Sequence, residues 1–395
     1  MKKLITMILL AAVVLLLSGC WSKRELSELA IVVALGIDKT DDEYAVSIQV
    51  VDPSEISASQ SSSGRAPVVT YHATGETLFK AIRKVTTLSP RKAYFAHLQM
   101  LVVGEDLARE GLRYTIDFLG RGNEIRNDFN IIVAHKTTAK NVLNVLTPIE
   151  KIPANKMLNS IRVSQREWGS TLQVDVDGLI NKLNDGGQNY VLSAVEVNGD
   201  PQLGIEQTNV QRISPSTILE FIGLAVFKQD KLIGLLSEEE SRSYNFLNNE
   251  IKGTLEIISC PEQGQLTTEI TNSKTKTKGK IKNGIPQIFV QIDVIQSVAE
   301  VNCDINLTDE QTLHMIDKET ENVIKNHIEQ LLDTIQKEYE ADILGYGDVI
   351  HRENAKEWKK MKDDWPTLFP ELQVNVEVNV NTQGLATLQN AKVKE

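Results

Sequence analysis

Aromatic residues are scarce in this sequence, since Phe, Trp and Tyr together make up 5% of its 395 residues. This scarcity argues against a binding surface built from stacked aromatic rings. An excess of cations is also missing, because 42 Lys and Arg stand against 53 Asp and Glu, for a net charge of −11. Nucleic-acid-binding domains usually carry a basic face, so we expect no nucleic-acid partner. The length favours two or three domains, at roughly 100–200 residues each.

Sequence patterns typical of catalysis and of metal binding are absent as well. Neither HExxH nor GxSxG occurs, and the six histidines do not stand at zinc-ligand spacing from one another or from a cysteine. Gly345-Tyr346-Gly347 begins like a dinucleotide-binding motif, but Ile350 takes the place of the third glycine. We therefore expect no catalytic, cofactor-binding or metal-binding residues, and no cofactor.

Long apolar runs are confined to the beginning of the chain. Lys2 and Lys3 precede an apolar run over residues 4–17, and beyond it no apolar stretch reaches 18 residues. As a helix the run would span about 21 Å, which is less than the ~30 Å hydrocarbon core of a bilayer. Residues 1–19 are therefore predicted to be a signal peptide and not a permanent membrane span.

The apolar run ends in Leu17-Ser18-Gly19-Cys20, which resembles the lipobox of bacterial lipoproteins. In such proteins the cysteine thiol receives a diacylglyceryl group and becomes the mature N-terminus. Two acyl chains give stable anchoring where a single chain is marginal. We predict that Cys20 is the lipidation site and that it holds a soluble body on an outer membrane face. The alternative is a plain signal peptide with a cysteine at its end.

The two other cysteines, Cys260 and Cys303, lie at the ends of predicted strands. Export would permit a disulfide between them if those strands are neighbours. More often such residues are buried thiols that act as small apolar groups. The sequence therefore favours unpaired cysteines and leaves the disulfide open.

Strands and helices alternate in the N-terminal half. The apolar patterns predict strands at 29–37, 44–51, 98–103 and 130–134, and helices at 76–88, 105–119 and 138–146. Residues 146–212 are less regular, with a short helix at 174–183, a strand at 190–197, and room for a further division near 146. We expect an α/β domain over residues 20–205, with the boundary between 200 and 215.

The C-terminal half, residues 213–395, is predicted to be an α+β domain. Strands are expected at 219–227, 253–259, 265–271, 286–301 and 372–380, with a helix from Ser237 to about residue 247 and a long helix over 309–340. The fold class is therefore α+β and multidomain, with mixed or antiparallel β-sheets each flanked by helices.

Residues 274–282 form a strip of five lysines at alternate positions, which places them on one face of a strand. The favoured interpretation is an edge strand that its charge protects against unwanted pairing. The alternative is an electrostatic surface for anionic lipid or for an acidic partner.

Several segments together resemble the Ger(x)C family of spore germination lipoproteins. They are CWSKRELSELA at 20–30 with LGID at 35–38, FAHLQ at 95–99 with GE at 104–105, IGLAVFK at 222–228, and GYGD at 345–348 followed by Trp358, Trp365 and Phe369. The resemblance implies the C subunit of a nutrient germinant receptor, which works with two integral membrane subunits, A and B, in the spore inner membrane. It also implies several domains, each a β-sheet surrounded by helices. The family has no established catalytic residues, so only Cys20 carries over and no enzymatic activity is expected.

We therefore expect a binding and assembly role for a protein anchored by lipid on the outer face of the spore inner membrane. Its partners would be the A and B subunits, and a small-molecule germinant would be an indirect partner. The alternative is a solute-binding lipoprotein that delivers a nutrient to membrane partners, which requires a pocket with convergent polar groups. A third alternative, an enzyme acting on cell-wall material, requires paired carboxylates at glycosidase separation, and no specific pair is evident.

Overall fold

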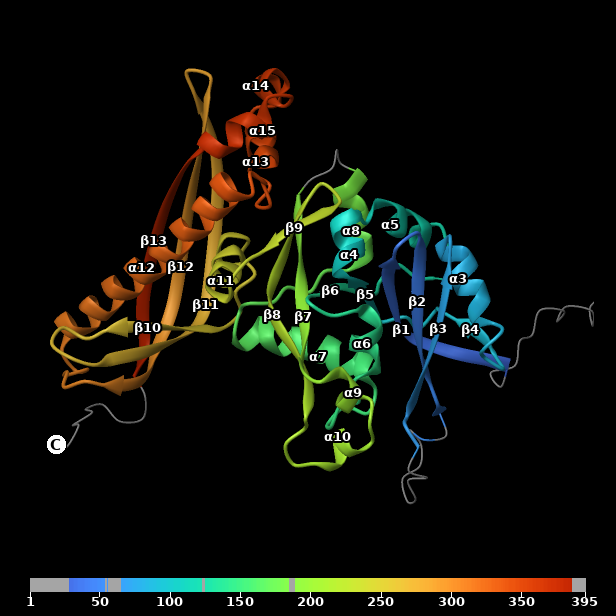
Figure 1. Cartoon of the computed structure of the whole chain (residues 1–395). Helices are drawn as coiled ribbons and strands as arrows, with labels where there is room; N and C mark the ends of the chain where they lie inside the picture. Colours follow the sequence, from blue (N-terminus) through green and yellow to red (C-terminus); the bar gives the residue numbers. More distant parts are fainter. Residues whose placement is uncertain (1–27, 54, 56–64, 123–124, 185–188, 386–395) are drawn as a thin grey trace, which may run out of the picture.

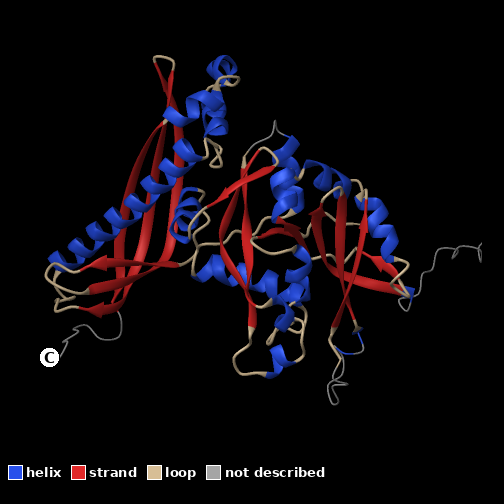
Figure 2. Cartoon of the chain, in the orientation of Figure 1, coloured by secondary structure: helices blue, strands red, loops and turns tan. Residues whose placement is uncertain are grey.

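The computed structural model describes residues 28–53, 55, 65–122, 125–184 and 189–385. These residues form a nine-stranded sheet and a four-stranded sheet that lie side by side, with helices against both (Figures 1 and 2). Both sheets mix parallel and antiparallel pairs. The predicted α+β class with helix-flanked sheets is confirmed.

The large sheet has the strand order β3-β2-β1-β5-β6-β7-β8-β9. Its centre is parallel and consists of β1 (Leu29–Thr40), β5 (Met100–Gly104), β6 (Asn130–Ala134) and β7 (Tyr190–Gly199). Antiparallel strands complete both edges: β2 (Glu43–Val51) and β3 (Val68–Gly75) on one, β8 (Thr217–Lys228) and β9 (Lys231–Leu235) on the other. The short β4 (Lys92–Tyr94) pairs with the start of β1.

Helices cover both faces of the large sheet, which explains why its central strands are apolar along their whole length. One face packs on α3 (Leu78–Val85), α4 (Glu105–Glu110), α5 (Arg113–Gly120) and α8 (Val176–Asn184). The other packs on α6 (Ala139–Asn144) and α7 (Pro153–Glu167). Along β5, Leu101 and Val103 join the first layer, whereas Met100 and Val102 join the second. The short helices α9 (Pro201–Gly204) and α10 (Thr208–Gln211) precede β8.

The single helix predicted at 105–119 is wrong, because the structure has two helices there. Gly111 ends α4 with φ +136°, a backbone conformation that residues with a side chain rarely adopt. The chain turns at this point, and α5 begins at Arg113. The glycine was visible in the sequence, but the continuing apolar spacing concealed the break.

The second sheet consists of β10 (Thr254–Ser259), β11 (Gln265–Lys282), β12 (Ile285–Asn302) and β13 (Gln373–Leu385). The first three are antiparallel, and β13 runs parallel to β12. The inner face of β12 presents Ile288, Val290, Ile292 and Val294, each at most 2% exposed, to the helices. These helices are α12 (Glu310–Asp333), which continues as a π-helical turn over Thr334–Glu338, and the shorter α13 (Tyr346–Glu353), α14 (Ala355–Met361) and α15 (Trp365–Leu368), with a 3-10 turn over Phe369–Glu371.

Helix α11 (Glu238–Leu247) lies between the two sheets (Figure 1). It begins with the expected capping box, in which Ser237 and Glu240 each bond the other's backbone N–H. One apolar cluster joins Leu224 and Val226 of β8 to Phe246 of α11 and to the inner face of β12. Strands β7 and β8, which stand on either side of residues 205–213 in the sequence, pair with each other in the large sheet. The division into domains 20–205 and 213–395 stays a prediction.

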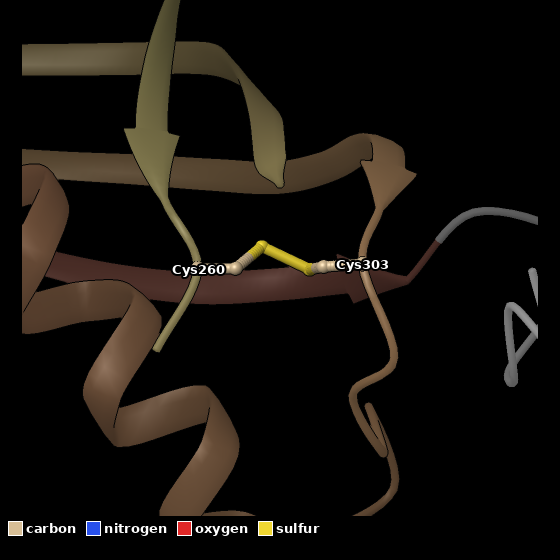
Figure 3. The surroundings of a disulfide bond; sticks show 2 residues. All are labelled: Cys260 and Cys303. Atoms are coloured by element: carbon tan, nitrogen blue, oxygen red, sulfur yellow. A yellow bond between two sulfur atoms is a disulfide. The ribbon is translucent and has the colours of Figure 1, made fainter. Parts of the chain in front are cut away.

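The favoured expectation for the remaining cysteines is wrong, because Cys260 and Cys303 form a disulfide (Figure 3). Their strands are not neighbours, since β11 lies between β10 and β12. The first residue of β11, Gln265, pairs with the last residues of both flanking strands. Each cysteine follows one of those strands, and their Cα atoms lie 6.5 Å apart beyond the end of β11.

Candidate functional site

The predicted lipidation site, Cys20, and the predicted signal peptide, residues 1–19, lie outside the described residues. The described chain begins at Glu28, one residue before β1. Within the described part, no helix combines the length and the apolar character needed to cross a bilayer. Candidate sites in the folded body are the carboxyl edge of the large sheet, its cavities, and the faces that helices leave uncovered.

Asp38 lies near the carboxyl end of β1, where the order of strands changes direction. From β1 the chain runs outward to β2 and β3 and then returns to β5 on the opposite side. Open α/β sheets usually bind ligands at such a point. The buried Asp38 carboxylate instead accepts hydrogen bonds from the backbone N–H groups of Ala139 (2.7 Å) and Lys140 (3.0 Å) at the start of α6. Burial raises the pKa of Asp38, while these two hydrogen bonds act in the opposite direction.

His135 follows β6 and lies between two carboxylates at the same edge. Its Nδ1 is 2.8 Å from Oε2 of Glu105, which follows β5, and its Nε2 is 3.6 Å from Oε1 of Glu196 on β7. Glu105 also accepts hydrogen bonds from the Lys136 N–H and from Arg109. Burial raises the pKa of Glu105, but these hydrogen bonds and the charges of His135 and Arg109 outweigh it and hold the pKa below its usual value. Glu105 is therefore ionised at neutral pH.

The polar groups at this edge are bonded to one another and to helix ends. They tie α4 and α6 to the sheet. Among the described residues, no group of three or more His, Cys, Asp or Glu side chains has the arrangement of a metal site. Sequence reasoning did not single out His135. Its place directly after a buried strand was the available signal.

A cavity of about 840 Å³ opens between α5, α8 and the turn that joins β8 to β9. Its wall includes Tyr44 and Tyr114, whose ring centroids lie 5.8 Å apart, together with Asp177 and Asp230. The Asp230 carboxylate accepts a hydrogen bond from the Arg113 N–H (3.2 Å). The cavity is open to solvent and its charged groups are partly or fully exposed, so it is not an enclosed pocket.

Gly345-Tyr346-Gly347, the motif that failed as a dinucleotide fingerprint, begins α13. The Asp342 carboxylate accepts hydrogen bonds from the N–H groups of Tyr346 (2.9 Å) and Gly347 (2.8 Å). It also accepts one from Nε1 of Trp365 (3.0 Å). Burial raises the pKa of Asp342, and the three hydrogen bonds act against that rise. A protein carboxylate therefore occupies the place where a phosphate would bind a helix N-terminus.

The lysine strip lies on the outer face of the second sheet, away from α12 and α13. Beyond Asn272, β11 pairs with β12 alone among the described strands, because its pairing with β10 ends at Ile270. The favoured interpretation as an edge strand is confirmed for this half of β11. All five lysines are exposed: Lys274, Lys276, Lys278, Lys280 and Lys282.

Comparison with protein families places both halves of the chain. Residues 22–197 match the model described as "Spore germination protein N-terminal domain", and residues 222–385 match "Spore germination B3/ GerAC like, C-terminal". A crystal structure of the GerBC protein has the same fold, with a TM-score of 0.57 and 21% identity over 88% of this chain and 96% of that one.

Curated relatives agree over nearly the whole length. Spore germination protein KC of Bacillus subtilis (strain 168) is 33% identical over 383 residues, which cover 95% of this chain and 94% of the relative. Spore germination protein B3 of the same organism is 23% identical over a stretch that covers 95% of this chain and 96% of the relative. The chain therefore belongs to the Ger(x)C family of spore germination proteins.

Proposed function

We propose that this chain is the lipid-anchored subunit of a spore nutrient germinant receptor and that it acts by assembly with integral membrane A and B subunits. The observation that carries the proposal is the end-to-end match to spore germination protein KC, together with the match of both halves of this chain to spore germination family models. The relatives and family models that the chain matches are described by spore germination and not by an enzymatic activity, which supports a receptor role.

Export of the body is supported by two independent features. The lipobox-like sequence Leu17-Ser18-Gly19-Cys20 follows a cationic and apolar leader. The Cys260–Cys303 disulfide fits the same compartment, because structural disulfides form and persist outside the reducing cytosol. A diacylated Cys20 would then hold the folded body on the outer face of the spore inner membrane.

An assembly role also follows from what tethering does to binding. A partner confined to the same membrane is met at a much higher effective concentration than in solution. Modest contacts by exposed surfaces of the folded body are then enough to keep the receptor together. The protein needs no enclosed site of its own for this role.

The test is the variant Cys20→Ala, expressed from the native locus in spores. We expect the protein to leave the membrane fraction and nutrient-triggered germination to slow at least tenfold, because the body loses its local concentration at the membrane. Ser18→Ala keeps a small residue before the cysteine and serves as the control with normal behaviour. Normal germination by spores whose Cys20→Ala protein is soluble would refute the proposal.

A solute-binding lipoprotein is the second candidate, favoured by the 840 Å³ cavity beside Arg113 and Asp230. Calorimetric titration of the mature chain with amino acids and sugars separates the two functions. Saturable heat that Asp230→Ala abolishes would support solute binding, and the absence of heat at millimolar ligand would leave assembly as the function.

A further inference from the structure

A groove of about 440 Å³ lies between α3, α5 and β4. Its apolar lining includes Phe79, Ile82, Phe95, Phe118 and Ile125. Phe79 is 56% exposed, and its ring meets that of Phe118 edge to face with centroids 6.5 Å apart. A soluble body gains nothing by leaving an aromatic ring in water beside an apolar groove, so this surface indicates an interaction.

Arg83 and Lys92 line the groove, and the segment that carries them is basic although the whole chain is acidic. Residues 76–95, which comprise α3, β4 and the segment between them, carry five cations and one anion, a net charge of +4 against −11 for the chain. Arg83, Lys84 and Arg91 are exposed. The Arg83 guanidinium lies 5.0 Å from the centroid of the Phe79 ring, so charge and apolar surface are directly adjacent. We call this surface, residues 79–95 with Phe118 and Ile125, the basic groove.

The basic groove lies next to the point where the tethered chain enters the fold. Lys92, which lines it, pairs in parallel register with Leu29, the first residue of β1. Cys20 precedes Leu29 by nine residues, and a chain of that length extends at most about 30 Å. A lipid on Cys20 would therefore keep the basic groove within about one small-domain diameter of the bilayer surface. The lysine strip belongs to the other sheet, at the opposite side of the molecule (Figure 1).

We propose that the basic groove is the membrane-facing surface of this protein and that it binds anionic phospholipid. The inference rests on the proposed lipid anchor at Cys20. Aromatic and cationic side chains favour the headgroup region, where rings enter the interface and cations meet anionic lipid. Weak binding suffices because the tether supplies the effective concentration. The groove thereby fixes which side of the body faces the lipid and which faces are open to other subunits.

The test supplies the tether chemically. Because the disulfide consumes Cys260 and Cys303, Cys20 is the free thiol of the mature chain and couples to a maleimide lipid in vesicles. Phe79→p-benzoylphenylalanine then forms an adduct with lipid on illumination. The matched control places p-benzoylphenylalanine at position 257 instead, where Ile257 is 52% exposed on β10 of the second sheet. With 30% phosphatidylglycerol we expect at least fivefold more lipid adduct at position 79 than at 257.

Charge reversal tests the cations of the basic groove. The double variant Arg83→Glu with Arg91→Glu should lower the adduct at position 79 at least tenfold, since each basic residue near an anionic surface strengthens binding about fivefold. Lys276→Glu with Lys278→Glu makes the same change of charge on the lysine strip and should leave the adduct unchanged. Equal adducts at 79 and 257, or equal losses in the two double variants, would overturn the proposal.

Two further outcomes are decisive. If position 79 in native spore membranes links to an integral membrane protein and not to lipid, the groove is a protein interface and the lipid proposal is wrong. Mass spectrometry of the mature N-terminus from spores tests the anchor separately. A lipidated Cys20 with no adduct at position 79 refutes the orientation alone, whereas an unmodified thiol with a strong adduct refutes the anchor alone.

Discussion

Removal of the disulfide should destabilise the second sheet strongly. The bond joins residues 43 positions apart, and the enclosed loop contains all of β11 and β12. In the folded protein these two strands are held by their own pairing, so the bond mainly restricts the unfolded chain. The chain-entropy relation for a loop of this length gives about 4 kcal/mol. We therefore expect Cys260→Ala with Cys303→Ala to lose about 4 kcal/mol of unfolding free energy.

The assay is urea unfolding of the mature chain followed by tryptophan fluorescence. Trp358 and Trp365 lie in the helical layer on the second sheet and report on this part of the molecule. With a slope of about 2 kcal/mol per molar urea, the transition they report should move about 2 M lower. Reduction of the unmodified chain with dithiothreitol should reproduce the shift, and Cys20→Ala should not.

A shift below about 0.5 M for the double alanine variant would refute this reasoning. It would mean that the unfolded loop is already compact without the bond, so that the bond removes little entropy. The agreement between reduction and mutation matters equally, because a large loss on mutation alone would point to poor packing of the alanines.

Two further predictions concern buried carboxyl groups. Burial raises the pKa of Glu256, near His327, to about 7 from 4.5. Because the folded state then binds this proton more tightly than the unfolded state, the free energy of unfolding should fall by about 3 kcal/mol as pH rises from 4.5 to 7. Glu256→Gln should flatten that slope, and Glu269→Gln, at an exposed position of β11, should not. An unchanged slope in the first variant would contradict the assignment. Asp342→Ala removes the acceptor for two backbone N–H groups and for the Trp365 indole. It should lower the free energy of unfolding, measured by thermal unfolding, by about 3 kcal/mol, and Asp342→Asn should lower it clearly less. Equal losses in these two variants would show that the acceptor is not what stabilises this turn.

Periodicity in the sequence predicted most individual elements. The unbroken apolar run at 29–37 predicted β1, which is buried on both faces, and the alternation at 372–380 predicted β13. The spacing of Ser237 and Glu240 located the start of α11. Each of these signals depends on residues a few positions apart, whose geometry the backbone of a strand or helix sets directly.

Features that depend on distant partners were not predictable in the same way. No local pattern in residues 146–212 predicted α7, because its apolar stripe is short and most of its residues are polar. The meeting of His135 with Glu105 and Glu196 needed the order of β5, β6 and β7 in the sheet. The disulfide needed the knowledge that β11 ends between two strands that do not touch.

The sequence by itself predicted a leader that ends at Cys20, most of the helices and strands, and the apolar face of each. Tertiary structure alone decided which strands pair, which cysteines meet, and that Arg83 of α3 and Lys92 of β4 line one groove beside the first residue of β1. The physical reason is that side-chain alternation orients a strand, whereas its hydrogen-bonding edges consist of the same N–H and C=O groups in every strand. A strand's neighbours are therefore chosen by the packing of the whole chain.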